Sequence, residues 1–191
     1  MKQRIIAAAA LAAFSIMGAA AEAASVQKAP VYFQSSAQLM GTGCPSGSVR
    51  VSGKGTSTLT VAVSKYDAAQ PSSAGTSGME RTSCNFTLPI SVPKGYQVSS
   101  MTMTWKGRAK GATELRREYF AAGERGPVKT SQPSGRFTTK DSLPSSLFSK
   151  CGEDAVLRIN SSARAADAGS KLTVGGQSGK LELRLKWRKC Q

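Results

Sequence analysis

Near its C-terminus the chain reads LELRLKWR over residues 181–188, an alternation of apolar and charged side chains. Side chains of a β-strand point in turn to its two faces, so this period of two predicts a strand with one buried and one wet, mainly cationic face. We expect Trp187 on the buried face with the three leucines. Strands of this kind are typical of antiparallel sheets that expose one side to solvent.

The same alternation recurs through the chain, separated by turns rich in Gly and Pro. It predicts strands around residues 59–63, 86–92, 101–105 and 157–159, with weaker candidates at 31–39, 49–52, 115–120 and 172–174. Outside the N-terminus, the only helical candidate is one short turn within 143–148. The pattern predicts an all-β fold: a two-sheet antiparallel sandwich of about eight or nine short strands with little helix.

Two features interrupt this pattern. Pro89 removes a backbone donor from its strand and so predicts an edge position or a bulge there. The stretches 68–83 and 123–143 combine small polar residues, prolines and scattered charges. We expect both to be long loops, which in a compact domain are either mobile or functional.

The N-terminus resembles an export signal. A basic start is followed by an apolar run from Ile5 to Met17 and by small residues, so residues 1–23 are predicted to be a signal peptide cut before Ala24. A cut after Ala21 is the alternative. The run is shorter than the roughly 20 residues that span a bilayer, which disfavours a permanent anchor. We therefore expect a secreted protein, extracellular or periplasmic, with an N-terminal segment 24–40 holding a candidate first strand and one β-sandwich domain over 41–191.

Four cysteines, Cys44, Cys84, Cys151 and Cys190, lie in the predicted mature chain, with no CxxC pair among them. Export to an oxidising compartment favours two disulfides, for which three connectivities exist. Residues 49–63 resemble a hairpin, whose ends return to one side of the molecule, and a second out-and-back unit separates the last two cysteines. We therefore predict Cys44–Cys84 and Cys151–Cys190, each worth about 4 kcal/mol in the chain-entropy model.

An ordered set of short motifs adds a family resemblance. The motifs are GTGCPSGS at 41–48, SCNF at 83–86, PKGY at 93–96, REYF at 117–120, KCG at 150–152 and LKWRKC at 185–190. In this order they resemble the secreted bacterial and fungal family catalogued as domain of unknown function 4360, over nearly the whole mature chain. The resemblance implies a small secreted β-rich domain with paired cysteines. It supplies no catalytic residues.

Charge is the most informative remaining feature. Lys and Arg number 26 against 11 Asp and Glu, for a net charge of +15 and a pI of about 10.1. Such cations could bind phosphates, sulfates or carboxylates on a polymer. The alternative is a soluble surface whose charges discourage edge pairing. The candidate contacts to an anionic ligand lie in two charged stretches: Lys106, Arg108, Lys110, Arg116, Arg117, Arg184, Lys186 and Arg188.

The sequence offers little support for catalysis. It contains no histidine, which excludes a Ser-His-Asp triad and a His-ligated zinc. Glu114 and Glu118 would lie roughly 13 Å apart on one strand face, too far for a glycosidase pair. We therefore predict a non-catalytic protein with no cofactor and no metal.

Two function hypotheses remain. In the first, the protein binds acidic envelope or matrix polymers through a cationic face. In the second, it is a structural or interaction protein of the cell envelope with a protein partner. Nucleic acid is a disfavoured ligand because the protein is exported. No membrane span is expected after signal cleavage, and the oligomeric state is open.

Overall fold

The computed structural model describes residues 29–71, 80–148 and 150–191. The predicted signal peptide and its cleavage site lie outside the described residues. Within the described part, no helix has the length and apolar character needed to cross a bilayer.

Two antiparallel sheets form the fold. The six-stranded sheet has the order β1-β6-β11-β8-β9, with β2 also paired to β6. Its strands are β1 (Tyr32–Phe33), β2 (Gln38–Met40), β6 (Glu80–Ser91), β8 (Thr113–Ala121), β9 (Glu124–Ser131) and β11 (Ala155–Ala165). The seven-stranded sheet has the order β3-β4-β13-β7-β12-β5, with β10 also paired to β7. Its strands are β3 (Val49–Ser52), β4 (Thr58–Val63), β5 (Asp67–Ala69), β7 (Tyr96–Lys110), β10 (Gly135–Pro144), β12 (Lys171–Val174) and β13 (Leu181–Lys189).

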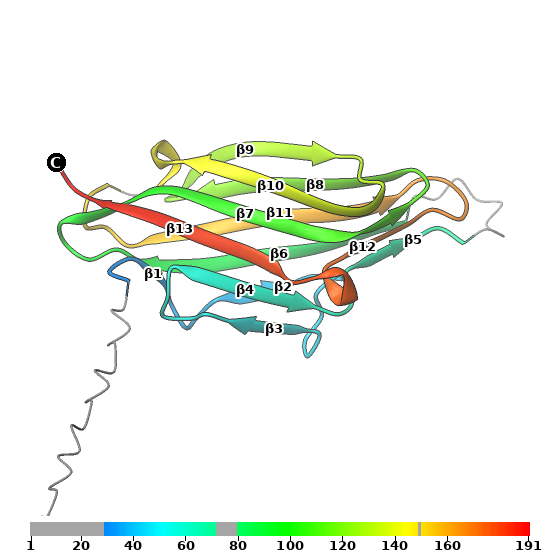
Figure 1. The fold of residues 1–191 in the computed structure, drawn as a ribbon, viewed down its shortest axis with the longest axis horizontal. Coiled ribbons are helices and arrows are strands. Elements are labelled where there is room, and N and C mark those ends of the chain that lie inside the picture. Colours follow the sequence, from blue (N-terminus) through cyan, green and yellow to red (C-terminus); the bar gives the residue numbers. More distant parts are fainter. Residues whose placement is uncertain (1–28, 72–79, 149) are drawn as a thin grey trace, which may run out of the picture.

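The two sheets stack face to face as a sandwich (Figure 1). The core lies between them and is made of the apolar residues that alternate along each strand. Trp105 of β7 is fully buried and meets the ring of Phe86 of β6 edge-on, with ring centroids 5.8 Å apart. Aromatic pairs prefer this geometry, so the contact helps to lock one sheet against the other.

The sandwich prediction is confirmed, but the strand count was too low. The described residues form thirteen strands, of which β7 has 15 residues and β6 has 12. The strand candidates all coincide with strands except the weak candidate at 31–39, where two short strands, β1 and β2, are separated by residues 34–37. The single helical turn is also present, as a 3-10 turn at Ser145–Leu147, and a second such turn, at Gly176–Ser178, was not expected.

The largest error concerns residues 123–143, which we expected to form a long loop. They form β9 and nearly all of β10, and these consecutive strands belong to different sheets, since β9 pairs with β8 and β10 pairs with β7. Most side chains of β9 and β10 are exposed and polar, so the alternation of apolar residues that marked the other strands is weak here. For the stretch 68–83, residues 72–79 are outside the described part, while 67–69 and 80–83 belong to β5 and β6.

Pro89 lies in a strand with neighbours on both sides, not at an edge. On one side it pairs with Val156 of β11. On the other side its carbonyl accepts a hydrogen bond from the Gln34 N–H, between the end of β1 and the start of β2. A residue of an antiparallel strand directs its N and O to the same side, so the proline nitrogen faces this break in the pairing, where no donor is needed.

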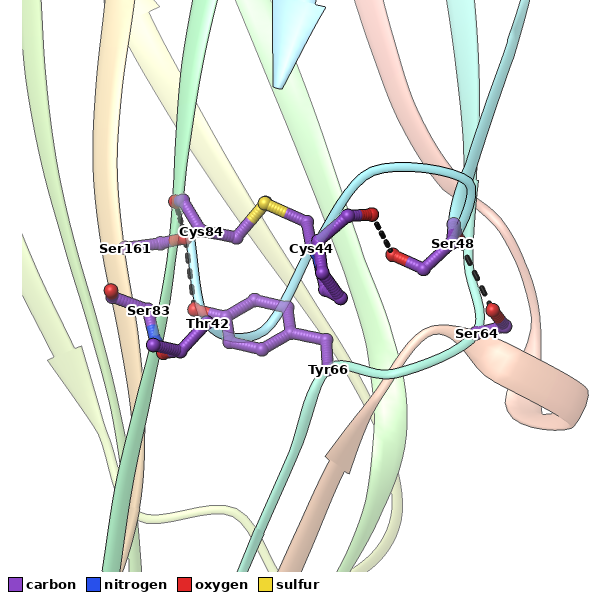
Figure 2. Close-up of a disulfide and its surroundings, with 9 residues drawn as sticks. Thr42, Cys44, Ser48, Ser64, Tyr66, Ser83, Cys84 and Ser161 are labelled. Atoms are coloured by element: carbon purple, nitrogen blue, oxygen red, sulfur yellow. Dashed lines mark hydrogen bonds between the residues drawn. A yellow bond between two sulfur atoms is a disulfide. The ribbon is translucent and has the colours of Figure 1, made fainter. Parts of the chain in front are cut away.

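The two disulfides are Cys44–Cys84 and Cys151–Cys190, the pairing expected from the sequence. Cys44 lies in the segment that leads from β2 of the six-stranded sheet to β3 of the seven-stranded sheet, and Cys84 lies within β6; Cys151 precedes β11 and Cys190 follows β13 of the other sheet. Figure 2 shows the first bridge beside Tyr66, whose hydroxyl donates to Ser161 Oγ at 2.9 Å. Burial raises the pKa of the Tyr66 hydroxyl, so it stays protonated and acts as a donor.

Residues of the segment 24–40, in which we expected a first strand, also pair with the sandwich. The strands β1 and β2 both pair with β6. Val31 and Phe33 have no exposed surface and belong to the core.

Candidate anion-binding face

An open groove of about 1030 Å³ lies on the outer face of the seven-stranded sheet. Four cationic side chains line it, and each comes from a different strand: Arg50 of β3, Arg108 of β7, Arg136 of β10 and Lys171 of β12. Asp67 of β5 is the one acidic residue among the lining side chains. Ser64, Thr173 and Gln177 add neutral polar groups to the lining.

Two pairs of like charges stand directly opposite each other in this part of the sheet. Arg108 is the register partner of Arg136, and Lys110 is the register partner of Lys171. Like charges at directly opposed positions of an antiparallel pair are destabilising. None of the four forms an ion pair within the described residues, so a bound anion would relieve the repulsion.

The cationic character continues beyond the groove along the same face. Alternation from Arg108 places Lys106 and Lys110 on this face, and cross-strand register adds positions on β10 and β13. The cations that project from this face are Arg50, Lys106, Arg108, Lys110, Arg136, Lys140, Lys171, Arg184 and Lys186. Asp67 and Glu182 are its acidic residues. We call this surface the cationic face.

Only Arg184 of this set is neutralised by an ion pair in the described structure, with its Nε 2.6 Å from Glu182 Oε1. The hydrogen bond from Arg184 lowers the pKa of Glu182 below its usual value, and Glu182 in turn raises the pKa of Arg184. Both groups are therefore ionised at neutral pH, and Glu182 competes with any external anion for Arg184.

The structure thus brings together five of the eight sequence-predicted contacts: Lys106, Arg108, Lys110, Arg184 and Lys186 lie on the cationic face. Arg116 does not, because it projects from the six-stranded sheet on the opposite side of the sandwich. There it pairs with Glu118 at 3.1 Å.

Arg117 is not available to a ligand from solvent, since it is only 2% exposed. It follows the inward alternation of Leu115 and Tyr119 and donates from Nε and Nη2 to the two carboxylate oxygens of Asp141, at 2.9 and 3.1 Å. A third nitrogen, Nη1, donates to the Leu115 carbonyl at 2.6 Å. Arg117 is therefore a buried cross-sheet contact between β8 and β10.

The network around Asp141 extends into the core. The Tyr119 hydroxyl donates to Asp141 Oδ2 at 2.5 Å and accepts from Trp105 Nε1 at 3.0 Å. Burial is the largest cause that raises the pKa of the Tyr119 hydroxyl, and the neighbouring Asp141 carboxylate adds to it. The hydroxyl therefore stays protonated and serves as a fixed donor.

The end of β13 lies beyond the positions that define the cationic face. The register shifts between Lys186 and Trp187 because β7 contains one extra residue there, Ser99, so alternation along β13 itself keeps Arg188 on the side of Arg184 and Lys186. Trp187, expected in the core, is 40% exposed and packs edge-on against Tyr96, with ring centroids 5.5 Å apart. Arg188 is exposed next to Gln97, beyond this shift.

Sequence reasoning missed four cations of this face: Arg50, Arg136, Lys140 and Lys171. One signal was available for two of them. Arg136, Thr138 and Lys140 alternate with Phe137 and Thr139 in the manner of a strand. Nothing in the sequence indicated that β3 and β12 would lie at the same groove.

The carboxylates that we weighed for catalysis are engaged elsewhere. Glu114 lies 3.5 Å from Arg164, and Glu118 contacts both Arg116 and Arg125. No group of three potential metal-ligating side chains occurs among residues 29–71, 80–148 and 150–191.

Comparisons with known proteins give a family and a set of distant folds. The sequence profile described as Domain of unknown function (DUF4360) matches residues 21–190. A search of curated proteins finds no match. The family description states no activity.

Several solved structures resemble the fold at low identity. One is TmCBM61 in complex with β-1,4-galactotriose, with 10% identity, a TM-score of 0.39, and coverage of 80% of this chain and 90% of that chain. The tailspike protein 4 domain of bacteriophage CBA120 has 13% identity and a TM-score of 0.36, over 80% of this chain and 20% of its own. The family 11 carbohydrate-binding module of a Clostridium thermocellum cellulase has 11% identity and a TM-score of 0.23, over 82% and 86%.

Proposed function

The chain belongs to the family described as Domain of unknown function (DUF4360), and we propose that it is a secreted, non-catalytic protein that binds acidic polysaccharides through its cationic face. The observation that carries this proposal is the groove in which Arg50, Arg108, Arg136 and Lys171 converge from four strands without ion-pair partners in the described structure.

The chemistry of the face favours an anionic sugar polymer. Guanidinium and ammonium groups bind carboxylates and sulfates through charge-assisted hydrogen bonds. Between them the face presents hydroxyls on neighbouring strands, among them Thr102 and Thr138, which can hydrogen-bond to sugar hydroxyl groups. No aromatic side chain is among the described residues that line the groove, so the base stacking on which single-stranded nucleic-acid binding relies has no platform there.

The test is a binding titration of the mature, disulfide-bonded protein against polygalacturonate and dextran sulfate, with neutral dextran as the uncharged reference. We expect the double variant Arg108→Gln/Arg136→Gln to weaken binding of both acidic polymers about tenfold. Exposed ion pairs contribute up to about 1 kcal/mol each, and 1.4 kcal/mol corresponds to a factor of ten.

The matched control removes two arginines from the opposite face. Arg81 and Arg158 are exposed, project from the six-stranded sheet and form no ion pair in the described structure. The variant Arg81→Gln/Arg158→Gln loses the same charge and should retain wild-type binding within about twofold, because these sites lie outside the groove. Equal losses in the two double variants would mean that net charge alone drives binding. If the wild-type protein binds neither polymer, a protein partner in the envelope becomes the leading hypothesis.

A further inference from the structure

Asp67 is the one acidic residue in a groove lined by four cationic side chains. It lies on β5 at the register position opposite Thr173, and Thr173 is in turn opposite Arg108. One line across the sheet therefore reads Arg136, Arg108, Thr173 and Asp67. Cross-strand partners point to the same face, so Asp67 projects into the groove that it lines.

The Asp67 carboxylate is half-buried and uncommitted. It forms no ion pair in the described structure, although Arg108 and Lys171 line the same groove. Glu182, the other acidic residue of the cationic face, is held by Arg184. Asp67 is thus a free acceptor within reach of whatever the arginines bind.

The spacing along this line sets a pattern for the ligand. Neighbouring strands are about 4.8 Å apart, so the backbones at Arg108 and Asp67 are separated by roughly 10 Å, with a threonine hydroxyl between them. If Arg108 and Arg136 hold an anionic group of the ligand, the part of the ligand about 10 Å further along lies over Asp67. That part must be uncharged if it is not to be repelled by the Asp67 carboxylate.

We propose that Asp67 is a specificity-determining residue that selects sparsely charged acidic polysaccharides over densely charged polyanions. This inference rests on the proposed function. A sugar hydroxyl can donate to Asp67, since an ionised carboxylate only accepts hydrogen bonds. A polymer with an anion on every unit places negative charge over Asp67 and therefore binds less tightly than its charge density alone would give, which is a means of specificity by penalising the wrong ligand.

The test measures Asp67→Asn against hyaluronan, which has one carboxylate per disaccharide, and inorganic polyphosphate, which has a charge on every unit. Asparagine keeps the shape of the side chain and removes the charge. We expect binding of polyphosphate to strengthen about three- to fivefold, because a like charge a few ångströms away in a solvated site is worth up to about that factor. Binding of hyaluronan should stay equal or weaken up to threefold, since a strong acceptor is lost.

The matched control is Glu182→Gln, which removes the same charge from the same face but at a residue already paired with Arg184. Glu182→Gln should strengthen the binding of both polymers by the same factor, so the ratio of their two affinities stays unchanged. An equal effect of Asp67→Asn on both polymers would overturn the inference while leaving the proposed function intact. If the wild-type protein binds polyphosphate as tightly as hyaluronan, the inference also fails. Absence of any hyaluronan binding by the wild-type protein would instead count against the proposed function.

Discussion

The outer faces of the two sheets both carry arginines, but the arginines differ in how many of them form ion pairs. On the six-stranded sheet, Glu118 contacts Arg116 and Arg125, and Glu114 lies beside Arg164. On the cationic face, one arginine is paired and the other cations of the set have no ion pair in the described structure. Three arginines of the six-stranded sheet are thus paired with carboxylates, although Arg81 and Arg158 are not, whereas the cationic face has one paired arginine among nine cations.

The two faces also differ in apolar exposure. Three of the exposed large apolar side chains project from the six-stranded sheet: Met40 at 66%, Val128 at 42% and Val156 at 41%. Since both faces carry arginines, net charge alone does not locate an anion site. The position of the acidic residues locates it, because a cation that is already paired with a carboxylate binds an external anion less strongly.

The largest expected effect concerns the buried arginine that belongs to neither face. Asp141→Ala leaves the Arg117 charge buried without its partner, which typically costs about 3–5 kcal/mol of folding free energy. Urea unfolding of the disulfide-bonded protein measures the loss. The double variant Arg117→Met/Asp141→Leu should recover most of it, because no charge then remains buried. A loss below about 1 kcal/mol in Asp141→Ala would mean that Arg117 reaches solvent. Arg117 would then have to be counted among the exposed cations when the two faces are compared.

The second prediction separates the two disulfides. Replacing both cysteines of either bridge by Ser should cost about 4 kcal/mol, because the bridges close loops of similar length, 40 and 39 residues. Only loss of Cys44–Cys84 should also weaken polygalacturonate binding, since this bridge anchors the chain just before Arg50. Urea unfolding and binding titrations on the same samples check both statements. Weaker binding in both variants alike would indicate a general loosening of the sandwich.

A smaller effect is expected from uncovering the paired arginines of the six-stranded sheet. Glu118→Gln releases Arg116 and Arg125 from their shared carboxylate. We expect a gain of about two- to threefold in dextran sulfate binding, within the range of an exposed ion pair. The gain should persist when it is combined with Arg108→Gln/Arg136→Gln, because it arises on the opposite face. If the combined variant shows no such increase in dextran sulfate binding, the increase arises at the groove and not on the opposite face.

The smallest effect is the response to pH. The chain has no histidine, and the hydrogen bond from Arg184 lowers the pKa of Glu182. Between pH 5.5 and 8, dextran sulfate binding should therefore change by less than about twofold. A lowered pKa means that the stabilising Glu182–Arg184 pair persists as pH falls through the usual glutamate range and is lost only below it. There, binding should strengthen as Arg184 is released. A midpoint near pH 6.5 in the binding curve would contradict this assignment.

Arg117 shows how far the sequence could be taken. Its position between Leu115 and Tyr119 in a period of two already indicated the inner face, but a charged residue in a row of cations is more often exposed. Asp141, which makes the burial possible, lies 24 residues away in a stretch where apolar alternation is weak. The outcome depended on a partner that no local pattern identified.

The sequence by itself determined the sandwich class, the main strand faces and the disulfide pairing, because these follow from period-two alternation and from local out-and-back units. Only the tertiary structure decided which cations share a surface. Arg108, Arg136 and Lys171 come from three strands far apart in the chain, and only the long-range pairing of β7 with β10 and β12 makes them neighbours. Such pairing depends on how all the strands pack together, so the groove and the isolated carboxylate of Asp67 could not be read from any single stretch of residues.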